Sequence, residues 1–154
     1  MSACDIQQAV ARRELTAAEV TLALNGLLEQ VNPALNAICT VNDAAQAQAE
    51  ACDARLRGGA AARPLEGVPV VVKDNIETAG LRTTFGSKLT PDFIPEENSV
   101  LVSRLLEAGA VILGKSNTPE FGWKGVTNNL LTDPARNPWN LERTPGGSSG
   151  GATV

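Results

Sequence analysis

Apolar and polar positions along the first sixty residues follow the spacing of amphipathic helices. Residues 16–19, Thr-Ala-Ala-Glu, have the form of a capping box, and apolar residues follow it at Leu22, Leu24, Leu27, Leu28 and Val31. We expect this helix to end at Pro33, because proline cannot continue the backbone hydrogen bonding. A second helix is expected from a cap at Asn42 to Arg57, with a glycine C-cap at 58–59. Both helices are interpreted as packing elements.

Three apolar runs are too short for helices and predict strands. They are residues 37–41, residues 68–72 and residues 110–113. The run 68–72, Val-Pro-Val-Val-Val, is apolar on both faces, which is typical of a buried central strand. A helix capped at Asn98 or Ser99 and ending at Gly109 separates the last two runs, and strand, helix and strand predict a crossover between parallel strands. The expected fold class is therefore α/β, with a helical N-terminal part and then a mixed sheet with flanking helices.

Composition narrows the function classes. With 17 acidic and 13 basic residues the net charge is −4, and no basic stripe suits a nucleic acid. No apolar run approaches the roughly 20 residues that span a bilayer, and no signal peptide is seen, so we expect no membrane partner and a cytoplasmic location. The cysteines Cys4, Cys39 and Cys52 have no metal-site spacing and no histidine partner. We interpret them as reduced structural thiols and expect no metal.

The sequence contains no histidine, so a Ser-His-Asp triad cannot be built within it. Lys73 is a candidate base of another kind, because it follows five apolar residues at the end of the second predicted strand. A lysine held in apolar surroundings is costly to charge, so its pKa should fall, and a neutral amine can act as a general base. The alternative is an ordinary strand-end lysine that reaches solvent or pairs with Asp74.

A second candidate lies in the polar, turn-rich stretch that follows Gly114. Residues 146–151, Gly-Gly-Ser-Ser-Gly-Gly, place the hydroxyls of Ser148 and Ser149 among four glycines, where the backbone can approach a substrate closely. The alternative is a flexible linker. Pro138 and Trp139 upstream argue against that alternative, because they interrupt the low-complexity composition. Long irregular segments within a domain are often functional.

Residues 109–116 match the P-loop pattern G-x-x-x-x-G-K-S literally. A P-loop needs its variable residues in a loop between a strand and a helix, whereas residues 110–113 are an apolar run that follows a predicted helix. Nucleotide binding through Lys115 is therefore the weakest hypothesis, and calorimetry with ATP would test it.

Several segments together resemble the amidase signature family. They are residues 67–75, which end in Lys-Asp-Asn, and residues 144–151, Thr-Pro-Gly-Gly-Ser-Ser-Gly-Gly, with supporting matches at 80–84, 108–115, 119–121 and 136–139 in the family's order. The resemblance implies that Lys73 is the catalytic base. It implies that Ser148, 75 positions further on, is the bridging serine, which follows a cis peptide bond after Gly147 and relays protons to a nucleophilic serine.

The resemblance also implies what the chain lacks. In the family the nucleophilic serine and the oxyanion hole follow the bridging serine, beyond the position of Val154. We therefore expect residues 1–154 to be the N-terminal part of a single amidase domain, with 1–66 mainly helical and 67–154 starting the signature core. We expect no activity from the chain alone. The implied substrate is a small-molecule amide, no cofactor is required, and the implied partners are the remaining amidase polypeptide or a second copy of the chain.

Two points stay open from the sequence. Gly122 and Ser148 are expected to contact substrate, because Gly122, Trp123 and residues 125–127 resemble a loop that lines the acyl pocket in the family. The alternative is that Phe121 and Trp123 are simply core anchors. At the level of the protein, there are two alternatives to a general amidase. One is part of the A subunit of a glutamyl-tRNA(Gln) amidotransferase, and the other is a non-catalytic, truncated remnant that acts as a binding or structural protein.

Overall fold

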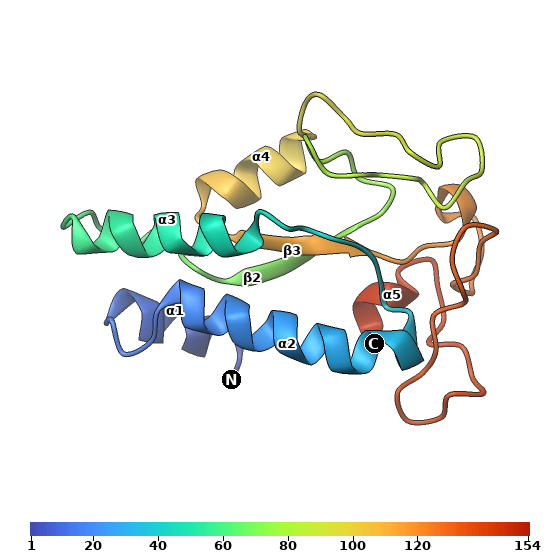
Figure 1. Ribbon diagram of the computed structural model, residues 1–154, viewed down its shortest axis with the longest axis horizontal. Coiled ribbons are helices and arrows are strands. Elements are labelled where there is room, and N and C mark those ends of the chain that lie inside the picture. Colours follow the sequence, from blue (N-terminus) through green and yellow to red (C-terminus); the bar gives the residue numbers. More distant parts are fainter.

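The computed structural model describes all residues from 1 to 154, and the fold is mixed α/β (Figure 1). Its elements in chain order are α1 (Ala3–Ala11), α2 (Ala17–Leu35), β1 (Ile38–Val41), α3 (Ala45–Arg57), β2 (Pro69–Lys73), α4 (Val100–Glu107), β3 (Val111–Ser116), the 3₁₀ turn η1 (Glu120–Gly122) and α5 (Gly150–Thr153). The predicted helices and strands are therefore present, with boundaries shifted by a few residues.

The three strands form one mixed sheet in the order β1-β3-β2. Strand β3 runs parallel to β2 and antiparallel to β1, and α4 lies in the connection between the parallel pair, as the crossover prediction requires. The prediction of β2 as a central strand was wrong, because β3 is the central strand and β2 lies at an edge. The apolar pattern of β2 reports that both its faces are covered, which does not specify how many strands flank it.

Helix α2 begins as predicted and ends later than predicted. Thr16 Oγ1 accepts a hydrogen bond from the Glu19 N–H at 3.0 Å, and the Glu19 carboxylate accepts from the Thr16 N–H at 2.8 Å, which completes the capping box. Pro33 does not end the helix. The helix continues to Leu35 and ends where Asn36 adopts a left-handed conformation with φ 51°, so proline removes one hydrogen bond within the last turn.

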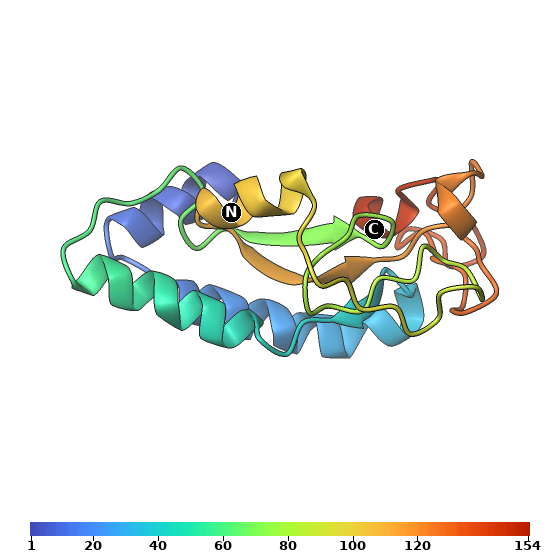
Figure 2. The same ribbon diagram turned by 90° about the horizontal axis from the view of Figure 1, so that it is seen from above.

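The sheet is covered on both faces. On one face Val111 and Leu113 pack with residues of α1, α2 and α3, among them Val10, Ala49 and Leu56. On the other face Val72 and Ile112 pack with Val102 of α4 and Leu81 of the segment after β2. Figure 1 and Figure 2 show that the long irregular segments after β2 and β3 gather at one end of the sheet, beside α5. The carboxyl ends of the two parallel strands therefore meet the glycine-rich segment at that end.

A bulge in β3 sets the orientation of the side chains at this end. Val70 pairs with Ile112 but Val71 pairs with Gly114, so Leu113 is an extra residue in the ladder. After the bulge Val72 pairs with Lys115 and Lys73 pairs with Ser116. Because neighbouring residues of a strand face opposite sides, Lys115 shares the α4 face with Val72, and Lys73 points to the other face.

Part of the apolar stripe predicted for α2 is not buried. Leu24 packs against the core, whereas Leu22 is 66% exposed, Leu27 is 51% exposed and Val31 is 37% exposed. The interpretation of α2 as a packing element therefore holds for one side of the helix only. None of the helices is long and apolar enough to cross a membrane.

Candidate active site

Lys73 and Ser148 lie next to each other at the carboxyl end of β2. Lys73 is the last residue of the strand, and its Nζ donates a hydrogen bond of 2.8 Å to the Oγ of Ser148. Ser148 follows a cis peptide bond after Gly147, in the turn that leads into α5. The fold therefore brings together two side chains that are 75 positions apart in the sequence.

The surroundings of Lys73 make its charged form less favourable than in water. Burial lowers the pKa of Lys73 from its ordinary value, and no carboxylate lies within 4 Å of its Nζ. The alternative pairing with Asp74 does not occur. The buried Asp74 carboxylate accepts hydrogen bonds from the backbone N–H and the hydroxyl of Thr84 instead.

Gly122 also lies at this site. It ends η1 with φ +71°, and a Cβ placed on it would lie 3.7 Å from Lys73 Nζ and 3.8 Å from Ser148 Oγ. The same Cβ would come within 3.0 Å of the Asn75 side-chain nitrogen. The absence of a side chain at Gly122 therefore keeps open the space beside the lysine and the serine.

The two aromatic residues beside Gly122 are not core anchors in this structure. Trp123 is 86% exposed and Phe121 is 55% exposed. The centroid of the Phe121 ring lies 6.1 Å from that of Phe85, within the range of interacting aromatic pairs. The core-anchor alternative was therefore wrong, because apolar composition does not distinguish a buried ring from an exposed one.

Lys115 is buried and serves the fold. Its Nζ donates to the Ile76 carbonyl and to the hydroxyls of Thr78 and Thr83, at 3.1 and 2.9 Å for the two hydroxyls. Burial lowers the pKa of Lys115 to about 8. Because residues 111–116 form the central strand, their backbone groups belong to the sheet and form no phosphate loop. The P-loop pattern is therefore a coincidence of sequence.

Two threonines hold the serine segment, and sequence reasoning gave neither of them this role. Thr118 donates a hydrogen bond of 3.1 Å to the Ser148 carbonyl, and Thr127 contacts the same loop through the Gly146 carbonyl. Both side chains are buried. They lie in an irregular stretch without periodicity, so a single sequence offers no signal that would relate them to residues 146–150.

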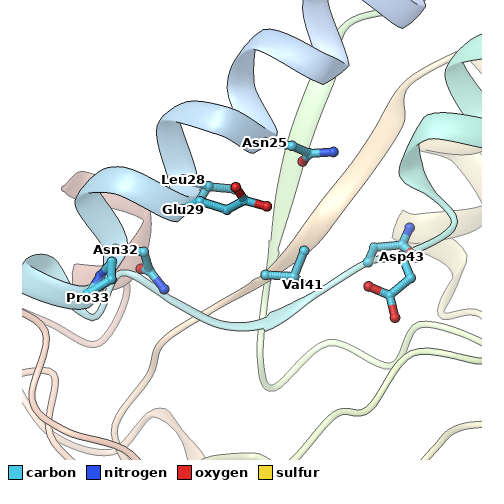
Figure 3. Close-up of a pocket in the computed structure, with 8 residues that line it drawn as sticks. Asn25, Leu28, Glu29, Asn32, Pro33, Val41 and Asp43 are labelled. Carbon is cyan, nitrogen blue, oxygen red and sulfur yellow. The ribbon is translucent and has the colours of Figure 1, made fainter.

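The structure also holds a polar groove of about 500 Å³ between α2 and the connection from β1 to α3. Figure 3 shows Asn25 and Glu29 on the helix, with Val41 and Asp43 on the facing segment. Lys73, Gly122 and Ser148 are not among its lining residues, so this groove is separate from the candidate site.

No group of three or more His, Cys, Asp or Glu side chains could hold a metal ion, and the three cysteines are free thiols.

A family model and curated relatives match most or all of the chain. The Amidase family model matches residues 19–154. Among curated relatives, the A subunit of the glutamyl-tRNA(Gln) amidotransferase of Roseiflexus sp. (strain RS-1) is 44% identical over 97% of this chain and 31% of its own length. The protein of the same name from Nitratidesulfovibrio vulgaris (strain DP4) is 45% identical over 100% of this chain and 31% of its own length.

Solved structures agree in fold. A bacterial aryl acylamidase of the amidase signature family is 32% identical with a TM-score of 0.93, over 99% of this chain and 32% of its own. A peptide amidase bound to the competitive inhibitor chymostatin is 32% identical with a TM-score of 0.92, over 98% of this chain and 32% of its own. The chain thus spans about a third of the length of the relatives that it matches.

Proposed function

Because this chain belongs to the amidase family, we propose that it supplies the base and the relay serine for the hydrolysis of a carboxylic amide. Lys73 is the base and Ser148 is the relay. The observation that carries this proposal is the 2.8 Å hydrogen bond between Lys73 Nζ and Ser148 Oγ, on a lysine whose pKa burial lowers. The distance lies within the range over which a proton is transferred directly.

The chemistry follows from the protonation states. Neutral Lys73 accepts the proton of the Ser148 hydroxyl while Ser148 Oγ accepts the proton of a nucleophilic serine, which then attacks the amide carbonyl. On collapse of the tetrahedral intermediate, the proton returns through Ser148 to the departing amine. Water hydrolyses the acyl-enzyme by the same relay. Ser148 is thus the group through which both proton transfers pass.

In this proposal the nucleophile and the oxyanion hole belong to polypeptide outside these 154 residues. Residues 1–154 form the N-terminal part of one amidase domain, with residues 67–154 starting its core. The chain alone is then inactive, and its catalytic partner is the remaining amidase polypeptide. Gly122 and Ser148 border the bound amide, since the missing side chain at Gly122 leaves room beside Lys73 and Ser148.

We place the protein in the cytoplasm, where free thiols such as its three cysteines persist.

A second candidate is supported by the relatives. Eight curated relatives are 40–45% identical to this chain, and each is named as the A subunit of a glutamyl-tRNA(Gln) amidotransferase. The amidases of known structure are about a third identical. In this second function the same lysine and serine act on an amide donor, and the released ammonia passes to glutamyl-tRNA. Both candidates therefore share one site and differ in the acceptor.

One pair of assays tests the proposal and separates the candidates. Hydrolysis of a simple aromatic or aliphatic amide is measured for the 154-residue chain and for an extended polypeptide, in which residues 1–154 are followed by the part of an amidase that the chain does not cover. We expect activity only from the extended polypeptide. Amide hydrolysis by the short chain would overturn the assignment and would point to Ser149 as a nucleophile. Glutamine-dependent amidation of glutamyl-tRNA, with no hydrolysis of simple amides, would select the second candidate.

A further inference from the structure

The hydroxyl of Thr127 spans the loop that carries Ser148. It donates a hydrogen bond of 2.8 Å to the Gly146 carbonyl and accepts one of 3.0 Å from the Gly150 N–H. These two backbone groups lie on either side of Ser148 in the sequence. The Thr127 side chain is 1% exposed, so water cannot readily replace it. One buried hydroxyl thus closes the loop from residue 146 to residue 150.

The segment 126–127 also shapes the loop by direct contact. A Cβ on Gly147 would lie 2.7 Å from the backbone of Val126, and a Cβ on Gly150 would lie 2.8 Å from Thr127 Cβ. Both distances are shorter than real Cβ contacts, so glycine at 147 and 150 allows the two segments to touch. Thr118 also donates a hydrogen bond of 3.1 Å to the Ser148 carbonyl. These contacts hold the backbone of the loop and leave the Ser148 hydroxyl free to accept the hydrogen bond from Lys73.

We propose that Thr127 is a positioning residue for Ser148: its hydroxyl fixes the loop 146–150 so that the serine hydroxyl meets the Lys73 amine. Thr127 touches neither Lys73 nor the Ser148 hydroxyl, and it acts through the backbone of its neighbours. This inference rests on the proposed role of Ser148 and adds a requirement to it, namely that the relay distance depends on a hydroxyl from an earlier segment of the chain. Displacement of a catalytic group by about 1 Å can lower a rate by about 100-fold.

The test uses three variants of the extended polypeptide. Thr127→Val keeps the shape and removes the hydroxyl, whereas Thr127→Ser keeps the hydroxyl and removes the methyl group. Thr21→Val is the matched control, because Thr21 is equally buried and its hydroxyl has no hydrogen-bond partner. We expect Thr127→Val to lower kcat for amide hydrolysis by about 10- to 100-fold with KM nearly unchanged. Thr127→Ser should restore kcat to near the parent value, and Thr21→Val should leave it unchanged.

Adding Ser148→Ala to the series distinguishes failure of the proposed function from failure of the positioning role of Thr127. If Ser148→Ala is as active as the parent, the proposed function fails. If Ser148→Ala is inactive while folded Thr127→Val has the kcat of the parent, or if Thr127→Ser is as impaired as Thr127→Val, the positioning role of Thr127 is wrong and the proposed function stands. Circular dichroism and thermal unfolding establish that each variant is folded. If Thr127→Val does not fold, Thr127→Ala is judged by the same outcomes, because it also removes the hydroxyl that joins Gly146 to Gly150.

Discussion

Lys73 and Lys115 project from neighbouring strands toward opposite faces of the same sheet. Lys73 pairs with Ser116 and Lys115 pairs with Val72, one step back along the ladder. Lys73 therefore reaches the glycine-rich loop and Ser148, while Lys115 reaches the segment from Ile76 to Thr83. In the proposed function Lys73 is the base, whereas Lys115 holds the segment that follows β2 through its hydrogen bonds. Burial lowers the pKa of both amines.

The first prediction concerns the pH dependence of catalysis. Because Lys73 must be neutral to act as a base and burial lowers its pKa, kcat/KM of the extended polypeptide should rise with pH and level off above the pKa of Lys73. The apparent pKa of this rise should lie below 10.5, the ordinary value for lysine. A pH–rate profile measures it. A profile in which activity rises only above pH 10.5 would show that Lys73 is not desolvated in the working enzyme.

The second prediction concerns Lys115 and stability. The pKa of Lys115 is about 8 in the folded chain and 10.5 without its environment, so between pH 8 and 10.5 the unfolded chain binds more protons and stability should rise with pH. The rise attributable to Lys115 is at most about 3 kcal/mol. Urea unfolding at several pH values measures it. Lys115→Met should be less stable, since the Ile76 carbonyl loses its donor, and should lack this rise; an equal rise in the variant would refute the assignment.

The third prediction concerns acid unfolding and Glu66. Burial alone would raise the pKa of Glu66, but hydrogen bonds from Arg63 and Arg55 outweigh it and lower the pKa to about 2. Because the ordinary value is 4.5, the ionised carboxylate stabilises the fold above pH 4.5, and this contribution is lost as the pH falls from 4.5 to 2. Glu66→Gln should lower the free energy of unfolding at pH 7 by about 2 kcal/mol.

The control for Glu66 is the exposed ion pair between Arg12 and Glu14, in which both side chains are more than half exposed. Glu14→Gln should change stability by well under about 1 kcal/mol. Denaturant unfolding at pH 7 and at pH 3 gives both values. If Glu66→Gln and Glu14→Gln have the same effect at pH 7, Glu66 is not the buried anchor described here.

Much of the fold follows from local sequence. The capping box before α2, the apolar runs of β2 and β3 and the helix between them predict the elements and the parallel crossover. The edge position of β2 was not predictable, because strand order depends on contacts between distant residues. The continuation of α2 past Pro33 was missed because tertiary context overrides a local breaker within the last turn.

The same limit on prediction from sequence applies to the candidate site. The neighbourhood of Lys73 and Ser148 could be expected from the resemblance of their motifs to those of one family, since motif order and spacing carry that information. The hydrogen bonds of Thr118 and Thr127 could not be expected, because they join irregular segments whose residues have no repeating pattern. The exposure of Trp123 could not be predicted either, since residue type indicates burial only on average.

The central claim is that Lys73 and Ser148 act as base and relay, and substitution in the extended polypeptide tests it most directly. Ser149→Ala is the matched control, because this exposed neighbour has the same side chain and its hydroxyl makes no hydrogen bond to Lys73. We predict that Lys73→Ala and Ser148→Ala each lower kcat/KM for amide hydrolysis by at least about 1,000-fold with the fold intact, while Ser149→Ala stays within about threefold of the parent. Near-normal turnover by either of the first two variants would contradict the assignment of base and relay.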